Sequence, residues 1–238
     1  MAPHPRSSPP PVAGPADDTR DPRVRILSAA GQEFAEHGYE AATVRDICAA
    51  AGVNVAAVNY YFGDKKRLYI ESVKHAHEER LRRVPYPEWP PGTPPSLKLH
   101  DFVENTLERM LGLTQPPWQV RLMMREVIQP TEACRELVEG YIRPHFGILL
   151  GVLDELTGGV SPASEVRRLG LSVIGQCFLY RAAGDVVAML VPAGEIDAYH
   201  TPQAIADHVT RFTLAAIGVA EPFACPGLGT VSVLEPPR

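Results

Sequence analysis

Residues 43–69 read TVRDICAAAGVNVAAVNYYFGDKKRLY, and this stretch decides the fold. Thr43 and Asp46 have the spacing of a capping box, in which side chains bond the free groups of a helix start. Apolar side chains then recur at i, i+3, i+4 and i+7 between Val44 and Ala51, which gives the segment one apolar face. We therefore predict a short amphipathic helix that begins after Thr43.

A second short helix follows directly. Gly52 favours a tight turn, Asn54 can cap a helix start, and the helical pattern ends near Phe62, before Gly63. Two short helices joined by a short turn that contains glycine are a helix-turn-helix. The second helix of such a pair is narrow enough to enter the major groove of DNA, which is about 12 Å wide.

The segments on either side of this motif are also helical in pattern. Upstream, apolar residues recur at helical spacing from Leu27 onward, and Gly38 lies where a glycine commonly ends a helix. Downstream, Asp64 can cap a helix that runs from Lys65 to about Arg83.

The later half of this downstream helix is rich in charge. Glu78 and Arg82, and likewise Glu79 and Arg83, are spaced at i, i+4 and can form ion pairs along the helix surface. We expect this half to be a solvated connector.

A loop with six prolines, Val84–Pro95, interrupts the helical pattern. Strand patterns are almost absent beyond it, so the predicted fold class is all-α, with a three-helix N-terminal domain and a larger C-terminal helical domain. The predicted C-terminal helices are Ser96–Leu113, Trp118–Gln129, Thr131–Thr157, Pro162–Leu190 and Pro202–Val219. The predicted divisions are a disordered tail (1–19), the helix-turn-helix domain with its connector helix (20–83), the proline-rich loop (84–95), the helical domain (96–220) and a flexible tail (221–238).

Composition excludes several classes of protein. The 238 residues are 45% hydrophobic with a net charge of −5, and residues 20–83 hold 11 basic and 9 acidic side chains, so the first third is relatively basic. No apolar run approaches the roughly 20 residues of a membrane span, and the proline-rich start is unlike a signal peptide, so we expect a cytoplasmic protein. The four cysteines, Cys48, Cys134, Cys177 and Cys225, form no CxxC pair, and we expect buried thiols without metal or other cofactor.

Three linked stretches resemble the TetR family of bacterial regulators. They are Arg25–Tyr39 (RILSAAGQEFAEHGY), Thr43–Asn54 (TVRDICAAAGVN) and Asn59–Tyr69 (NYYFGDKKRLY). The resemblance covers nearly the whole N-terminal domain. It implies a homodimeric, sequence-specific regulator that binds double-stranded operator DNA, usually as a repressor, and releases it when a small-molecule effector binds the C-terminal domain. Two fainter stretches, Arg121–Glu126 (RLMMRE) and Leu171–Tyr180 (LSVIGQCFLY), are similar to the sensor domain of the CecR-like branch.

The family also implies which positions face DNA. Its usual tyrosine and histidine are replaced here by Asn59 and Tyr61, and an amide such as that of Asn59 suits adenine. The positions implied to contact bases or phosphates are Thr43, Arg45, Asn54, Val55, Ala56, Asn59, Tyr60, Tyr61 and Lys65.

Plainer interpretations of these residues stay open. Tyr60 and Tyr61 can be packing aromatics, and Val55 has the periodicity of the core. Lys65, with Lys66 and Arg67, can be no more than a solvated helix start.

The family dimerises through its last two long helices, which here are Pro162–Leu190 and Pro202–Val219. Their apolar stripe predicts a dimer surface, and its alternative is the core of one chain. The residues of this stripe that we assign to the interface are Leu169, Val173, Cys177, Val209, Phe212 and Ala216.

Polar side chains on otherwise apolar helices are candidates for the effector pocket. Arginines there can hold an anionic ligand, and their alternative is a structural ion pair or a place on the surface. The predicted lining is Trp118, Arg121, Met124, Arg125, Gln176, Tyr180 and Arg181.

Common enzyme motifs are absent from the sequence. Gly170–Gly175 misses the GxSxG spacing, and the sequence has no Walker A loop, HExxH or GxGxxG. We therefore predict that the protein is not an enzyme. The alternative is a helical interaction module, or a small-molecule-binding protein, without DNA binding.

Overall fold

A computed structural model of the chain describes residues 21–111, 117–192, 194–196 and 200–219. Helices make up this part of the chain, which contains no strand, and the predicted all-α fold is confirmed. The two tails, Cys225 and the end of the predicted helix Ser96–Leu113 lie outside the described residues. The helices are α1 (Pro22–Ala41), α2 (Val44–Ala51), α3 (Val55–Phe62), α4 (Lys65–Arg83), α5 (Pro95–Leu111), α6 (Pro117–Ile128), α7 (Glu132–Leu137), a π-helix (Val138–Ile142), α8 (Arg143–Leu156), α9 (Ala163–Ala182), α10 (Gly184–Leu190) and α12 (Pro202–Ala216).

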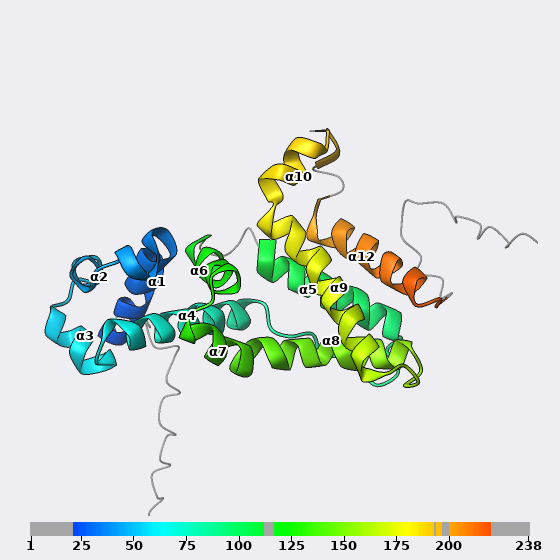
Figure 1. Ribbon diagram of the computed structural model, residues 1–238, viewed down its shortest axis with the longest axis horizontal. Coiled ribbons are helices and arrows are strands. Elements are labelled where there is room, and N and C mark those ends of the chain that lie inside the picture. Colours follow the sequence, from blue (N-terminus) through cyan, green and yellow to red (C-terminus); the bar gives the residue numbers. More distant parts are fainter. Residues whose placement is uncertain (1–20, 112–116, 193, 197–199, 220–238) are drawn as a thin grey trace, which may run out of the picture.

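The side chains pack into two hydrophobic cores, one in each lobe of Figure 1. The first core joins α1–α4 to α6 and α7. The second core is formed mainly by α5, α8, α9 and α12. Helices α6 and α7 therefore pack on the N-terminal helices, although the chain reaches them only after α5 has entered the second core.

The contact between α1 and α6 is close and specific. The indole of Trp118 lies directly against Gly31, where an added Cβ would be 2.2 Å from a ring carbon. On the next turns, Arg125 donates from its guanidinium to the carbonyl oxygens of Ala35 and Glu36, both at 3.1 Å. These contacts hold α6 along the last turns of α1.

Side-chain caps set the short helices of the N-terminal domain. The hydroxyl of Thr43 accepts from the Asp46 amide at 3.1 Å and donates to its carboxylate at 2.6 Å. Asn54 accepts from the Ala57 amide at 3.0 Å, and Asp64 accepts from the Arg67 amide at 2.7 Å. All three predicted caps are confirmed, and each satisfies an amide that the helix start leaves free. Gly38 breaks the helical backbone of α1 at φ +80°, and one further turn follows it.

The prediction of one helix over Pro162–Leu190 is wrong, because the structure divides this segment into two helices. The backbone leaves the helix at Ala183, and α10 bends away from α9 by 82°. Its start also differs, since α9 begins at Ala163 with no side-chain cap from Ser161. The cap predicted for the last helix is confirmed: Thr201 accepts from the Ala204 amide at 3.1 Å.

The predicted helix Thr131–Thr157 contains a π-helical segment, Val138–Ile142. The helical run is continuous through it, with α7 in the first core and α8 in the second. π-Segments inside helices are rare and commonly occur at functional positions. This one is the joint at which the run passes from one core to the other.

The later half of α4 is less solvated than its charge pattern indicates. Arg80 is buried, and Glu78 accepts from the Tyr141 hydroxyl at 2.7 Å instead of pairing with Arg82. Glu79 forms the ion pairs on this side of the helix, with Arg82 and Arg83. The expected connector is therefore partly a core helix.

None of the described helices is, by itself, long and apolar enough to cross a membrane; only α9 and α10 taken together across their bend meet the criterion of length and composition.

Gly31→Ala should weaken the contact of α1 with α6, because the new methyl group overlaps the Trp118 indole. Overpacking costs about 1–3 kcal/mol and better helix propensity offsets about 0.5–1 of it, so we expect a net loss of about 1–2 kcal/mol in unfolding free energy. Urea unfolding measures this loss. Gly147→Ala on α8 is the matched control, since its Cβ would have nothing within 4 Å. Equal effects of the two substitutions would contradict the assigned contact.

Candidate nucleic-acid interface

The candidate interface is the outer side of α2 and α3, at the far end of the first lobe (Figure 1). Val58 and Phe62 fix α3 by burying their side chains in the first core. This leaves the opposite side of α3 exposed, with Val55 at 48% and Tyr60 at 83% of full exposure. The open question about Val55 is thereby answered, because its side chain does not join the core.

The other predicted DNA-contacting positions lie on the same end of the molecule. Thr43, Arg45, Asn54, Ala56, Asn59 and Tyr61 are all exposed. The rings of Tyr60 and Tyr61 pack edge to face with centroids 5.1 Å apart, outside the core. The structure thus brings eight of the nine predicted positions together on α2, α3 and their caps as exposed side chains.

Lys65, the ninth position, is half-buried. Its ammonium donates to the Glu40 carbonyl at 3.1 Å and lies 4.8 Å from the centre of the Tyr39 ring. The two residues that follow are also engaged by the protein: Lys66 pairs with Glu132 at 2.6 Å, and Arg67 pairs with Glu71 at 2.8 Å. The first turn of α4 therefore has a structural role that its basic sequence alone does not reveal.

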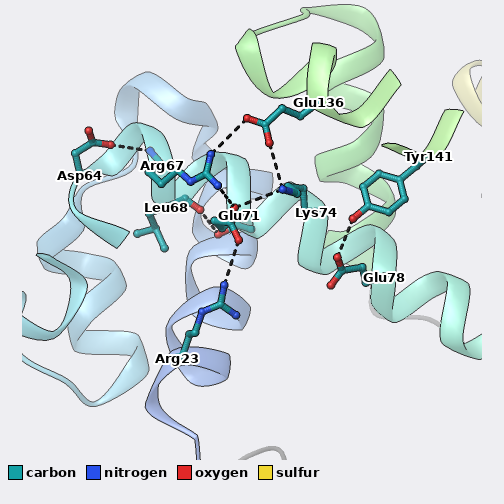
Figure 2. A network of polar contacts seen from close by, with 10 residues as sticks. Arg23, Asp64, Arg67, Leu68, Glu71, Lys74, Glu78, Glu136 and Tyr141 are labelled. Carbon is teal, nitrogen blue, oxygen red and sulfur yellow. Dashed lines mark hydrogen bonds and ion pairs between the residues drawn. The ribbon is translucent and has the colours of Figure 1, made fainter. Parts of the chain in front are cut away.

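A polar network fastens α1, α4 and α7 together behind this surface (Figure 2). Glu71 of α4 accepts from Arg23 of α1 at 3.1 Å and from Arg67 at 2.8 Å. Glu136 of α7 accepts from Arg67 at 3.5 Å and from Lys74 at 3.2 Å. Single pairs of this kind contribute little, but a shared network restricts how the three helices move relative to one another.

A buried carboxylate links α6 to α4 and to the start of α7. Glu126 of α6 is fully buried and accepts from the Tyr69 hydroxyl of α4, from the Thr131 amide at 3.2 Å and from the Thr131 hydroxyl at 3.0 Å. Burial and the bond to this carboxylate raise the pKa of Tyr69 above its ordinary value, so the phenol stays protonated as a donor. The sequence marks Glu126 as a polar residue on an otherwise apolar helix but does not predict these partners, because its i, i+5 spacing to Thr131 belongs to no motif.

The predicted pocket residues do not come together. Trp118 and Arg125 hold α6 against α1, Met124 is half-buried, and Arg121 is exposed. The other three belong to α9, whose buried residues lie in the second core. There Gln176 donates to the Ser172 carbonyl at 3.4 Å, the Tyr180 ring lies 5.7 Å from the His200 ring, and Arg181 has a buried Nε without a partner.

The predicted dimer residues divide between the core and the surface. Val173, Cys177 and Val209 are fully buried in their own chain, so their side chains cannot meet a partner, and the alternative interpretation holds for them. Leu169 is half-buried, whereas Ala216 is exposed and Phe212 is 57% exposed. Leu171 and Leu179, which periodicity did not select, are exposed on α9.

A helix-turn-helix at one end and a separate helical core at the other define the class of ligand-responsive, DNA-binding transcriptional regulators. Residues 26–71 match the family described as bacterial regulatory proteins, tetR family. Residues 95–217 match the C-terminal domain of the HTH-type transcriptional dual regulator CecR. The chain belongs to this CecR group of TetR-family regulators, and both resemblances noted in the sequence are confirmed.

Individual relatives agree with this assignment. The HTH-type transcriptional dual regulator CecR of Shigella flexneri is 27% identical over 185 residues, which cover 70% of this chain and 78% of the relative. The HTH-type transcriptional repressor AcnR of Corynebacterium efficiens is 48% identical over 48 residues, which cover 20% of this chain and 26% of the relative.

Solved structures support the fold. A TetR-like transcriptional regulator from Rhodococcus sp. RHA1 has a TM-score of 0.58 at 19% identity, covering 83% of this chain and 96% of that one. The regulator FadR from Bacillus subtilis, solved in complex with stearoyl-CoA, has a TM-score of 0.57 at 18% identity, covering 80% of this chain and 97% of that one.

Proposed function

We propose that the protein is a homodimeric repressor that binds a two-fold operator through α2 and α3 and releases it when a small molecule binds the second lobe. The observation that carries the proposal is the exposed side of α3, where Val55, Ala56, Asn59 and Tyr60 project from a helix that Val58 and Phe62 hold rigidly. Rigid presentation of a short helix is what reading a major groove requires. The alternative, an interaction module without DNA binding, leaves this side of the helix without a role.

Residues 20–83 form the DNA-binding domain in this proposal, and residues 96–220 form the sensing and dimerisation domain beyond the loop 84–95. The protein acts by binding and not by turnover, and it acts where the bacterial chromosome lies, in the cytoplasm. A dimer suits the DNA-binding role because one short helix reads few bases. Two half-sites about one duplex turn apart, roughly 34 Å, multiply the specificity.

The proposed dimer surface is the exposed side of α9 and α12, two helices that contact each other in the second core. Leu171 and Leu179 project from α9, and Phe212 and Ala216 project from α12. Gly175 lies between the two leucines with nothing within 4 Å of an added Cβ, which leaves room for a partner helix. Pairing of two such surfaces gives a four-helix interface.

Selection of bound sequences from random DNA is the primary test. We expect a recurring inverted repeat, and failure to enrich any sequence would favour the alternative. Asn59→Ala should relax the preference at one position of each half-site by about 1–3 kcal/mol, because an asparagine amide discriminates between base edges. Binding to a panel of single-base operator variants measures this. Uniform weakening across the panel would instead assign Asn59 to the phosphate backbone.

Salt dependence tests the assignment of Lys65. If Lys65 also meets a phosphate, Lys65→Ala should reduce the slope of log affinity against log salt by about 0.9 per engaged subunit. Lys98→Ala is the matched control, since it removes the same charge from α5, where Lys98 pairs with Glu155 at 2.6 Å. If Lys65→Ala and Lys98→Ala leave the slope equal, Lys65 serves only its contacts with Glu40 and Tyr39.

Phe212→Glu should convert the dimer to folded monomers, because it places a charge in the proposed apolar interface. Sedimentation velocity measures the association state, and circular dichroism checks that the helices remain. Val160→Glu is the control, since Val160 is 85% exposed in the turn between α8 and α9, away from the proposed surface. A dimer that survives Phe212→Glu would place the interface elsewhere.

A further inference from the structure

Cationic and aromatic side chains from α4, α5, α8 and α9 converge between the two cores. The guanidinium of Arg80, near the end of α4, donates to the Arg109 carbonyl of α5. The guanidinium of Arg109 bonds His145 Nδ1 of α8 at 3.1 Å and lies 4.4 Å from the centre of the Tyr86 ring. Both arginines are buried, with Arg109 only 6% exposed.

Two of these cations, Arg109 and Arg181, lack the anion that normally accompanies a buried cation. In the part of the chain that the structure describes, neither Arg109 nor Arg181 forms an ion pair with a carboxylate. The Nε of Arg181 and the Nε2 of His77 are buried without any hydrogen-bond partner. Buried charges and buried polar atoms are ordinarily satisfied, and an unsatisfied one is strongly unfavourable. Two unsatisfied groups that lie beside buried arginines therefore need a ligand to explain them.

The electrostatics of the cluster agree with this. Burial, and then the charges of Arg109 and Arg181, lower the pKa of Arg80 to about 10. Burial, and then the charges of Arg80 and Arg109, lower the pKa of His77 to about 3. Burial, and then Arg109 and His77, lower the pKa of His145 to about 3. Both imidazoles are therefore neutral at pH 7, and the guanidinium of Arg80 is repelled by those of Arg109 and Arg181 in a medium of low dielectric constant.

We propose that His77, Arg80, Arg109, His145 and Arg181 form the binding site for the anionic group, a carboxylate or a phosphate, of the effector. This proposal rests on the proposed function in one respect only, which is that the bound anion is the effector of the regulator. The planar guanidinium groups of Arg109 and Arg181 can each donate two parallel bonds to such a group. His77 Nε2 supplies a further polar contact, and the Tyr86 and Phe102 rings, which stack on His145 at 5.0 and 4.4 Å, give the site an apolar wall.

The position of the site explains how binding reaches the DNA-binding domain. Tyr141, in the π-helix, packs on His77 with ring centroids 4.2 Å apart, donates to Glu78, and accepts from Tyr86 at its carbonyl. The cluster thus touches two of the segments that link the lobes in the described part of the chain: the end of α4 and the joint between α7 and α8. An anion that draws Arg80 and His77 closer to Arg109 shifts both connections at once.

Calorimetric titration of the full-length protein tests the proposal, at fixed ionic strength set with chloride. The probes are inorganic phosphate, benzoate and, as the neutral counterpart of benzoate, benzamide. We expect phosphate or benzoate to bind with a dissociation constant of about 1 mM or tighter, and benzamide not to bind. Binding of phosphate alone identifies a phosphate site, and binding of benzoate alone identifies a carboxylate site. Absence of binding by both anions would overturn the proposal.

Arg109→Gln and Arg181→Gln should each weaken binding of that anion at least about tenfold, as loss of a charge-assisted bond does. Arg121→Gln removes the same charge from the exposed side of α6 and should leave the affinity unchanged. Arg181→Gln should also keep or raise the melting temperature of the ligand-free protein, because it relieves repulsion. Unchanged anion affinity in both cluster variants, or equal weakening by Arg121→Gln, would overturn the site.

Operator binding by the same proteins separates this proposal from the proposed function. Without anion, Arg181→Gln should bind operator as the wild type does, and the anion should release only the wild type. Anion binding by a wild type that binds no DNA would refute the regulator and leave the site standing. DNA binding by a wild type that binds no anion would refute the site alone.

Discussion

The bond between Glu126 and Tyr69 is the constraint on which the arrangement of the first lobe depends. A fully buried carboxylate is tolerated only when its oxygens are satisfied, and here a phenol from α4 and two donors of Thr131 satisfy them. This fixes α6 and the start of α7 against the middle of α4. Trp118 and Arg125 also hold α6 against α1. The DNA-binding helices therefore form one packed unit with α6 and α7.

Motion between the two lobes is consequently restricted to few places. Two helical segments that the structure describes connect the lobes. The run from α7 through the π-helix to α8 passes from one core to the other, and α4, whose buried apolar side chains lie in the first core, reaches the second lobe at Arg80, which donates to the Arg109 carbonyl. With 19 residues, α4 spans about 28 Å at 1.5 Å per residue, and it carries both Lys65 at its first turn and Arg80 near its last. The network of Glu71 and Glu136 ties the two connections together, so that α4 and α7 move as a pair (Figure 2).

Local signals made most of the helices predictable, whereas the packing of one helix on another depends on tertiary contacts and was not predictable. Thr43, Asn54 and Asp64 act on amides within three residues, so spacing alone is sufficient to place the helices that they cap. Val55 was ambiguous because a helix of 8 residues, about two turns, offers too few apolar positions to define a face. The apolar periodicity of α6 shows that one side of the helix is buried, but it does not show which of the two cores that side joins. The packing of α6 on α1 therefore could not be predicted. The burial of Arg80 was missed for a related reason, since a charged pattern favours solvent until a neighbouring helix covers it.

A ligand shifts a conformational equilibrium only by its differential affinity for the two states, which decides whether the arginine cluster can act as a switch. Arg109 and Arg181 lie on α5 and α9, which are fixed together in the second core, whereas Arg80 and His77 lie on α4, whose start is fixed in the first. Without an anion, repulsion between the guanidinium groups favours a larger separation of α4 from α5 and α9. An anion between the three guanidinium groups favours a smaller separation of these helices. The arginines therefore push α4 away when the site is empty and draw it closer when an anion is bound. The affinity is differential for this reason, and the displacement necessarily falls on α4, which leads to the helices that present Asn59 and Tyr60.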